Sequence, residues 1–354
     1  MMMEIRSRFK TYQVDFVDSL QSIQQLAAQK ETYFVVDRII YDLYRDVLSI
    51  LPEQRLFLLE ALEEYKTIDT ALLICEQLTA MPSKRNTHLV SIGGGIVQDV
   101  TGFVATSIYR GIPWTFYPTT LLAACDSCIG GKSSLNYKKF KNLLGTFYPP
   151  DVINIYFPFF KTLSNRDYAS GLGEVVKFNV IAGQNRFNAI EKDIDLVLAH
   201  DYAVLNKYVE TSLYFKKTFI EEDEFDQGIR VLLNFAHTFG HAYEVSSHYA
   251  IPHGLAVAMG MITANNISVQ RGFLTADYAE RIERVCNKLL QFIDMDDKWF
   301  ALDVILNAIH KDKKQIGNSI TAVLIKREQT LEVFHNIQET EVELAIKHLL
   351  EKRV

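Results

Sequence analysis

The chain has 354 residues, 48% hydrophobic and 23% charged, which is enough to bury a sizeable core and to form two domains. Its formal net charge of -6, with Lys and Arg scattered along the sequence, argues against a nucleic-acid partner. Four cysteines do not suggest a disulfide framework in a chain of this length, and no apolar stretch is long enough to cross a membrane. We therefore expect a cytoplasmic protein without membrane association.

The first half of the sequence alternates strand-like and helix-like segments. Tyr33–Val36 and His88–Ile92 are short apolar runs of the kind found in buried parallel strands, and Trp114–Tyr117 is a third. Residues 53–81, between the first two runs, show the apolar spacing of a helix. This alternation predicts an α/β domain with a doubly wound sheet.

Beyond about residue 160 the pattern changes to long helical segments. Residues 201–222, 257–270 and 277–292 have helical periodicity and few Gly or Pro residues. No long polar linker separates the two halves. We expect an α/β domain over residues 1–160 and an all-helical domain over residues 161–354.

Three consecutive glycines follow the second predicted strand. Backbone amides of Gly93, Gly94 and Gly95 can approach a diphosphate at the start of the next helix. The same glycines also fit a tight turn without a ligand, and their spacing differs from the usual G-x-G-x-x-G. Asp37, at the end of the first strand, fits either a contact to an adenosine ribose or a helix N-cap. Both interpretations remain open at both positions.

Polar side chains recur at helical spacing in the second half, which predicts a polar stripe along one helix. They are Arg230, Asn234, His237 and His241. His253 lies 16 residues beyond His237, and Glu174 and Lys177 share a face of an earlier helix. Two imidazoles and a carboxylate with an open fourth position are the ligand set of a catalytic zinc. The other histidines are interpreted as structural: His88, His200, His248, His310, His335 and His348.

Six sequence blocks, in this order, resemble the 3-dehydroquinate synthase family of sugar-phosphate cyclases. The blocks are Gly93–Asp99, Tyr109–Gly111, Pro118–Ser127, Gly130–Asn142, Gly171–Lys177 and Asn234–Gly254. Any one block could arise by chance, but the ordered set is specific. The resemblance implies an N-terminal doubly wound nucleotide-binding domain followed by an all-helical metal-binding domain.

The resemblance also implies roles for individual residues. Glu174, His237 and His253 resemble the ligands of a zinc ion, with cobalt as an alternative metal. The residues that resemble NAD contacts are Asp37, Glu63, Lys66, Gly93, Gly94, Gly95, Asp99, Thr119, Thr120, Lys141 and Thr162. The residues that resemble substrate contacts are Asp126, Lys132, Asn142, Lys177, Arg230, Asn234 and His241, together with Lys313 or Lys314. Arg110 resembles an arginine that crosses a dimer interface to the partner's phosphate, which implies a homodimer.

The activity implied is that of a phosphate-eliminating carbon-oxygen lyase of aromatic amino-acid biosynthesis, the shikimate pathway. Such an enzyme converts 3-deoxy-arabino-heptulosonate 7-phosphate to 3-dehydroquinate and phosphate. The steps are transient oxidation by NAD, phosphate elimination, re-reduction and intramolecular aldol closure. Asp99, Asn234 and His241 match the members that act on this seven-carbon acid. A related cyclase acting on sedoheptulose 7-phosphate, in a surface-sugar or secondary-metabolite pathway, is the alternative.

A further alternative is a metal-dependent alcohol or glycerol dehydrogenase, which shares the two-domain plan. Such an enzyme needs no phosphate-binding side chains, so Lys132, Lys141 and Asn142 argue against it. One departure from the family pattern lies just after the predicted nucleotide-binding glycines. Gln98 stands where the family has a glycine, which suggests a narrower approach to the nicotinamide.

Overall fold

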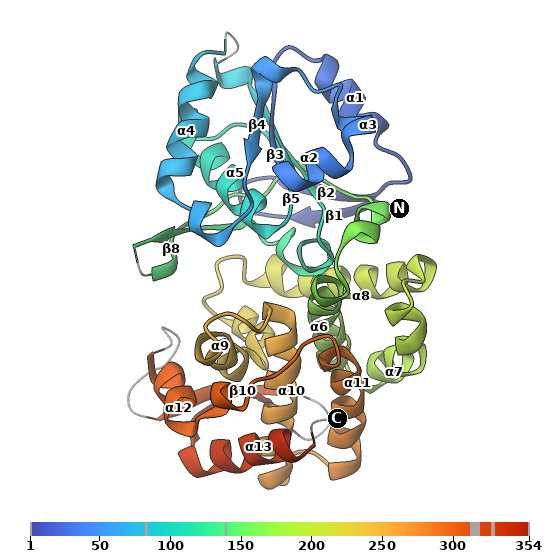
Figure 1. Ribbon diagram of the computed structural model, residues 1–354, viewed down its shortest axis with the longest axis vertical. Coiled ribbons are helices and arrows are strands. Elements are labelled where there is room, and N and C mark those ends of the chain that lie inside the picture. Colours follow the sequence, from blue (N-terminus) through green and yellow to red (C-terminus); the bar gives the residue numbers. More distant parts are fainter. Residues whose placement is uncertain (1, 82–83, 139, 312–318, 327–329, 353–354) are drawn as a thin grey trace. The chain divides into compact units, whose positions relative to one another are not determined.

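A computed structural model describes residues 2–81, 84–138, 140–311, 319–326 and 330–352. The chain forms two compact units (Figure 1). The first comprises Met1–Leu163 and returns for Ile220–Phe225, and the second comprises Ser164–Phe219 and Asp226–Val354. Each unit is described by itself below.

The first unit is built on a seven-stranded sheet with the order β1-β2-β9-β6-β5-β3-β4. Its strands are β1 (Met2–Arg6), β2 (Thr11–Phe16), β3 (Thr32–Asp37), β4 (Leu56–Leu59), β5 (His88–Gly93), β6 (Trp114–Pro118) and β9 (Val152–Ile155). β1 and β2 pair antiparallel, and the other neighbours pair parallel. β7 (Lys132–Tyr137) and β8 (Phe140–Phe147) form a separate antiparallel pair. The predicted α/β class is confirmed.

The prediction of one helical segment over residues 53–81 is wrong in its first part. Leu56–Leu59 forms the edge strand β4, which pairs parallel with β3. A run of four apolar residues has no period that separates a strand from a buried helical turn, so pairing with the sheet decides its structure. The helix begins only after Thr67, whose hydroxyl accepts a hydrogen bond from the Thr70 amide at 3.3 Å.

Helices lie on both sides of the sheet in the first unit (Figure 1). They are α1 (Gln21–Ala28), α2 (Arg38–Leu43), α3 (Arg45–Leu48), α4 (Ile68–Thr79) and α5 (Gly95–Ser107). β5 runs into α5 through the glycine turn. Residue 93 is a glycine because a Cβ at this position would collide with the side chain of Val97. The turn therefore brings the start of α5 directly to the carboxyl end of a central strand.

The second unit is mainly helical. Its helices are α6 (Asn165–Ile181), α7 (Gln184–Leu198), α8 (Tyr202–Glu222, whose last turn belongs to the first unit), α9 (His237–Ser246), α10 (His253–Gln270), α11 (Ala276–Leu290), α12 (Leu302–Lys311) and α13 (Glu339–Glu351). α10 packs against α6, α9, α11 and α13, and residues 254–265 are all buried. A helix that is buried on every side forms the core of this unit. The three helical segments predicted in this half are confirmed.

The second unit departs from the all-helical prediction at one place in the described chain. β10 (Ile320–Ile325) and β11 (Leu331–Ile337) form an antiparallel pair. β10 is rich in β-branched residues, and its Ile320 pairs with Ile337 of β11, both buried. Cross-strand packing of such side chains favours a sheet over a helix.

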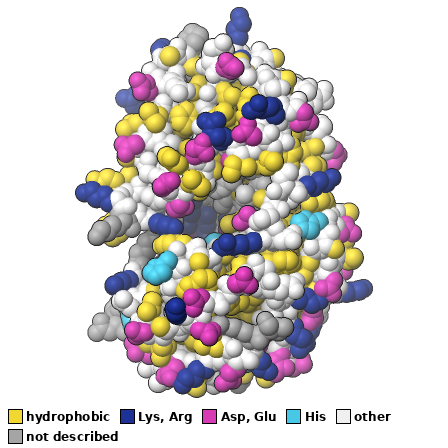
Figure 2. Space-filling view, viewed as in Figure 1, with side chains coloured by type: hydrophobic (Ala, Val, Ile, Leu, Met, Phe, Trp, Pro, Cys, Tyr) yellow, Lys and Arg dark blue, Asp and Glu magenta, His cyan; other side chains and the backbone are white. Residues whose placement is uncertain are grey.

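The visible surface carries mixed charge. Lys and Arg side chains are interspersed with Asp and Glu side chains over the face shown in Figure 2. On that face the described residues therefore create no extended field of one sign of the kind that attracts nucleic acid. None of the described helices combines the length and the apolar character needed to span a bilayer.

Candidate active site

Glu174, His237 and His253 converge at one point in the second unit. Glu174 comes from the middle of α6, and His237 and His253 are the first residues of α9 and α10. One ligand atom from each lies within 4.8 Å of the others. Glu174 Oε1 is 3.4 Å from His237 Nε2 and 3.3 Å from His253 Nε2, and the Glu174 side chain is fully buried. This donor set fits Zn²⁺ and leaves a coordination position for a substrate oxygen.

Glycines bring the three helices of this cluster into backbone contact. A Cβ on Gly173 would collide with the carbonyl group of Gly254, and a Cβ on Gly254 would collide with that of Ser170. The Gly254 amide also donates a hydrogen bond to Ser170 Oγ at 3.0 Å. Between α9 and α10, a Cβ on Gly260 would collide with the Ala236 carbonyl oxygen. The positions of the three ligand side chains therefore follow from close helix packing at glycines.

Neighbouring acceptors orient both imidazoles. His237 Nδ1 lies 3.0 Å from the Phe235 carbonyl oxygen, which can only accept, so this nitrogen carries the proton. His253 Nδ1 lies 3.3 Å from a carboxylate oxygen of Glu244. In both rings the second nitrogen, Nε2, faces Glu174. A hydrogen-bonded Nδ1 that directs Nε2 toward a cation is the usual arrangement of a histidine metal ligand.

The charges of the cluster suit a divalent cation. Burial alone would raise the pKa of Glu174, but Lys177, with Nζ 2.5 Å from Oε2, and the two imidazoles hold that pKa well below its usual range. Burial and Lys177 lower the pKa of His237 to about 4. Burial would also lower the pKa of His253, but Glu174 and Glu244 raise it to about 10. The cluster thus offers a carboxylate, a neutral imidazole and an imidazolium whose proton a metal would displace.

The prediction that four polar residues lie along a single helix is wrong. Arg230 and Asn234 lie in a 3-10 turn (Ile229–Asn234), and the chain then turns sharply at Ala236, which has φ of 71°. α9 begins only at His237, so His237 and His241 share a helix and the other two do not. The turn places the Phe235 carbonyl oxygen 3.0 Å from His237 Nδ1.

His241 lies beside the cluster but is not one of its three converging ligands, Glu174, His237 and His253. Its ring centroid is 5.4 Å from that of His237 and 6.0 Å from that of His253. With Glu244 and His253 it forms a second group whose ligand atoms lie within 4.8 Å of one another. Sequence reasoning missed Glu244, although His237, His241 and Glu244 fall on one helical face at i, i+4 and i+7.

We expect Glu244→Ala to weaken metal binding about 10- to 100-fold, because the His253 ring loses the carboxylate that orients it and increases its basicity. Competition with a chromogenic chelator measures this change. Glu343→Ala, which removes an exposed acid on α13, is the matched control and should leave the affinity unchanged. Equal affinities of the two variants would contradict the role given to Glu244.

A polar network in the first unit joins several of the predicted NAD and substrate residues. Lys66 Nζ lies 2.5 Å from Asp99 Oδ2 and donates to Asn142 Oδ1 at 2.7 Å. The Ser134 amide and hydroxyl donate to the Asp99 carboxylate at 3.1 and 3.0 Å. Burial raises the pKa of Asp99, and Lys66 and Ser134 oppose that effect. The network fastens the β7–β8 hairpin to α5 and to the segment before α4.

Replacing Lys66 with methionine is expected to destabilise the protein by about 2 kcal/mol, because the Asp99 carboxyl group, only 17% exposed, loses its buried cationic partner. Urea unfolding without added cofactor measures the change. Lys141→Met, at an exposed ion pair with Glu63 whose N···O distance is 3.9 Å, should cost less than about 0.5 kcal/mol. A Lys66 variant as stable as the Lys141 variant would show that the buried pair contributes little.

The start of α5 has the features of a diphosphate-binding turn. Its N-cap residue is Gly94, which has no side chain with which to cap the first backbone amides. A Cβ on Gly94 would lie 3.0 Å from Thr120 Cγ2, whereas one on Gly95 would meet no heavy atom within 4 Å. The Thr119 amide donates to the Gly93 carbonyl oxygen at 2.9 Å. Backbone amides at a helix start with open space in front of them fit a bound nucleotide diphosphate.

Other predicted residues have defined places in the first unit. Asp37 caps α2 by accepting a hydrogen bond from the Ile39 amide at 2.9 Å, so the N-cap interpretation is confirmed. Thr162 Oγ1 donates to the Phe159 carbonyl oxygen at 3.1 Å. Arg110 is exposed, with φ of 66°. Lys132 begins β7, Lys141 and Asn142 lie on β8, Glu63 begins a 3-10 turn (Glu63–Tyr65), and Asp126 lies in a π-helical turn (Ala123–Ser127). Lys313 and Lys314 lie outside the described residues.

Gln98 has a structural partner. Its Nε2 donates to the Ser127 carbonyl oxygen at 2.7 Å, and Ser127 Oγ donates back to Gln98 Oε1 at 2.7 Å. The Gln98 side chain is buried. This reciprocal pair ties the π-helical turn that carries Asp126 to the first turns of α5.

An α/β unit with an open glycine turn, followed by a helical unit with a Glu-His-His cluster, defines a class of two-unit proteins built for a nucleotide and a divalent metal. Within that class the chain belongs to the 3-dehydroquinate synthase family. The family's N-terminal domain, described as 3-dehydroquinate synthase N-terminal, matches residues 56–170, and its C-terminal domain, described as 3-dehydroquinate synthase C-terminal, matches residues 171–315.

Individual relatives agree with this assignment. The 3-dehydroquinate synthase of Dictyoglomus thermophilum is 36% identical over 318 residues, which cover 89% of this chain and 88% of that protein. A 2-deoxy-scyllo-inosose synthase complexed with carbaglucose-6-phosphate, NAD⁺ and Co²⁺ has the same fold, with a TM-score of 0.87, 22% identity and coverage of 98% and 100%. A 2-epi-5-epi-valiolone synthase from Streptomyces hygroscopicus, with NAD⁺ and Zn²⁺ bound, gives a TM-score of 0.85, 22% identity and coverage of 98% and 99%.

Proposed function

We propose that this protein is a 3-dehydroquinate synthase, a carbon-oxygen lyase that depends on NAD and on a divalent metal. Its substrate would be 3-deoxy-arabino-heptulosonate 7-phosphate, and its products 3-dehydroquinate and phosphate. The observation that carries the proposal is the buried Glu174, His237 and His253 cluster, in a chain 36% identical to a named 3-dehydroquinate synthase. The NAD⁺ and the Zn²⁺ or Co²⁺ bound to the two proteins of the same fold support the same cofactors here.

When bound, NAD would accept and return a hydride, and the metal would stabilise negative charge on substrate hydroxyl oxygens. Each group of the cluster then has a task. Glu174, His237 and His253 hold the cation, and Glu244 fixes the proton on His253 Nδ1. Lys177, buried and paired with Glu174, keeps an ammonium group beside the ligands, where it would donate a hydrogen bond to the substrate.

The other predicted substrate residues suit a phosphorylated, hydroxylated acid. We assign Arg230, Asn234 and His241 to contacts with the substrate's polar groups, because charged and amide donors recognise carboxylate and hydroxyl groups. Lys132 and Asn142 are assigned to the phosphate. We further propose a cytoplasmic homodimer that acts in the shikimate pathway, with Arg110 reaching the phosphate bound by the partner subunit.

The deciding experiment supplies the purified protein with NAD and Zn²⁺ and measures phosphate release from each candidate sugar phosphate. We expect release from 3-deoxy-arabino-heptulosonate 7-phosphate, with no net NADH, and loss of activity on adding a chelator. Turnover of sedoheptulose 7-phosphate but not of the acid would replace the proposed substrate. Net accumulation of NADH would instead identify a dehydrogenase.

A further inference from the structure

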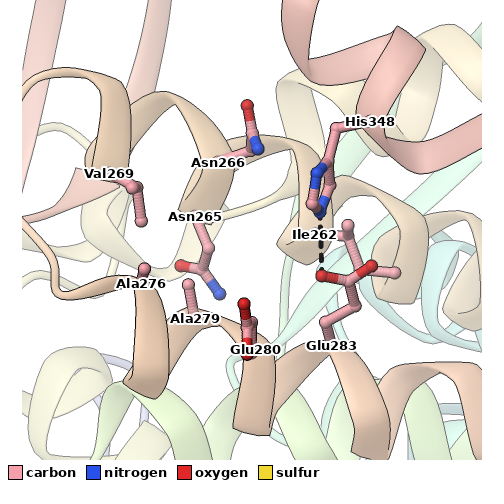
Figure 3. Close-up of a pocket in the computed structure, with 9 residues that line it drawn as sticks. All are labelled: Ile262, Asn265, Asn266, Val269, Ala276, Ala279, Glu280, Glu283 and His348. Atoms are coloured by element: carbon pink, nitrogen blue, oxygen red, sulfur yellow. Dashed lines mark hydrogen bonds and ion pairs between the residues drawn. The ribbon is translucent and has the colours of Figure 1, made fainter. Parts of the chain in front are cut away.

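A cavity of about 70 Å³ lies within the second unit, between α10, α11 and α13 (Figure 3). Asn265 and Ile262 line it from α10, Glu280 and Glu283 from α11, and His348 from α13. Asn265 follows the metal-cluster residue His253 by 12 residues on the same helix, about 18 Å along its axis. The cavity is therefore separate from the metal cluster, and none of the residues predicted to bind metal, NAD or substrate lines it.

The side-chain amide of Asn265 is a buried polar group in this cavity. Its side chain is only 2% exposed, yet neither Oδ1 nor Nδ2 has a hydrogen-bond partner within the described structure. Figure 3 shows its amide directed toward α11. Burying an amide without partners costs free energy, on the order of 1–3 kcal/mol, and a hydrophobic residue would avoid this cost. A polar molecule in the cavity would supply the hydrogen bonds that this buried amide can make.

Glu283 provides a second unsatisfied group in the same cavity. Its side chain is 8% exposed, and its Oε2 accepts a hydrogen bond from His348 Nε2 at 2.9 Å. Its Oε1 is buried and has no hydrogen-bond partner among the residues that the structure describes. Glu280, which is exposed, brings another carboxylate to the rim of the lining, and His348 brings its single imidazole. The lining thus has more hydrogen-bond acceptor atoms than donor atoms, and its carboxyl groups outnumber its imidazoles.

We infer that this cavity binds a small organic cation, a primary ammonium group that carries a hydroxyl group. The ammonium would donate to Glu283 Oε1 and Asn265 Oδ1, and the hydroxyl oxygen would accept from Asn265 Nδ2. Ile262 and Val269 give an apolar surface for the methylene groups. A metal ion fits less well, because the acidic and imidazole groups of this lining form no cluster of three close ligand atoms in the described chain.

Ethanolamine is a suitable probe, and ethylene glycol is a neutral molecule of the same size. Calorimetric titration of the full chain should show saturable ethanolamine binding and no ethylene glycol binding. Glu283→Gln keeps the shape of the side chain, removes its charge, and should weaken ethanolamine binding at least about tenfold. Glu343→Gln, at an exposed pair with Lys347, is the matched control and should bind as the unchanged protein does.

The other outcomes would overturn the inference. Equal binding of ethylene glycol would show a neutral polyol site, and the absence of saturable ethanolamine binding would show a cavity that holds only water. Asn265→Leu provides a second test that fills the cavity with an apolar group. If this variant folds, the inference requires that ethanolamine no longer binds, and if it does not fold, Glu283→Gln decides alone.

Discussion

His237→Ala is expected to remove the bound metal and to reduce turnover by roughly 1000-fold, because several kcal/mol of transition-state stabilisation depend on the cation. The cluster offers two imidazoles and one carboxylate, so the variant keeps only Glu174 and His253 as ligands. His237 is also the imidazole whose pKa is lowered to about 4 and which is therefore ready to bind without losing a proton. Metal content by elemental analysis and phosphate release from the proposed substrate measure the two effects.

Two further variants distinguish effects on metal binding from effects on binding of the substrate phosphate. His310→Ala removes a histidine of α12 that pairs with Glu339, and it should keep both metal and activity. Arg110→Ala, in the first unit, should keep the metal while raising the KM for the phosphorylated substrate. A His237 variant that retains metal at full occupancy would refute the ligand assignment.

Local patterns in the sequence were sufficient for much of the fold, whereas the metal ligands Glu174, His237 and His253 were singled out by the family resemblance. The apolar runs that became β3, β5 and β6 end at Asp37, Gly93 and Pro118, as the sequence predicted. Histidine spacing placed His237 and His241 on one helical face, but it could not place His253 beside them. Glu244 could have been found by the same helical-face test, since it shares a face of α9 with His237 and His241.

Other features depend on contacts between distant segments, which no local pattern contains. The left-handed backbone at Ala236 separates Arg230 and Asn234 from α9, and its carbonyl fits only because residue 260 is a glycine. The return of Ile220–Phe225 to the first unit is a second case. There Glu224 accepts a hydrogen bond from the Arg8 amide at 2.7 Å, although the preceding helix shows no interruption in its sequence.

The glycine contacts make a second strong prediction, at Gly254. We expect Gly254→Ala to destabilise the protein by at least about 3 kcal/mol, because the new methyl group would collide with the backbone carbonyl of Ser170 rather than with a flexible side chain. Relieving the collision moves α10 away from α6, and with it His253 away from Glu174. Metal affinity should therefore fall together with stability.

The matched control is the same substitution where space is available. Gly95→Ala, at the first residue of α5, introduces a methyl group with no heavy atom within 4 Å, so it should change the free energy of unfolding by less than about 1 kcal/mol when measured without nucleotide. Urea unfolding and metal titration of both variants give the comparison. Equal stability of the two would mean that α6 and α10 do not touch at Gly254, and the metal geometry built on that contact would then need another origin.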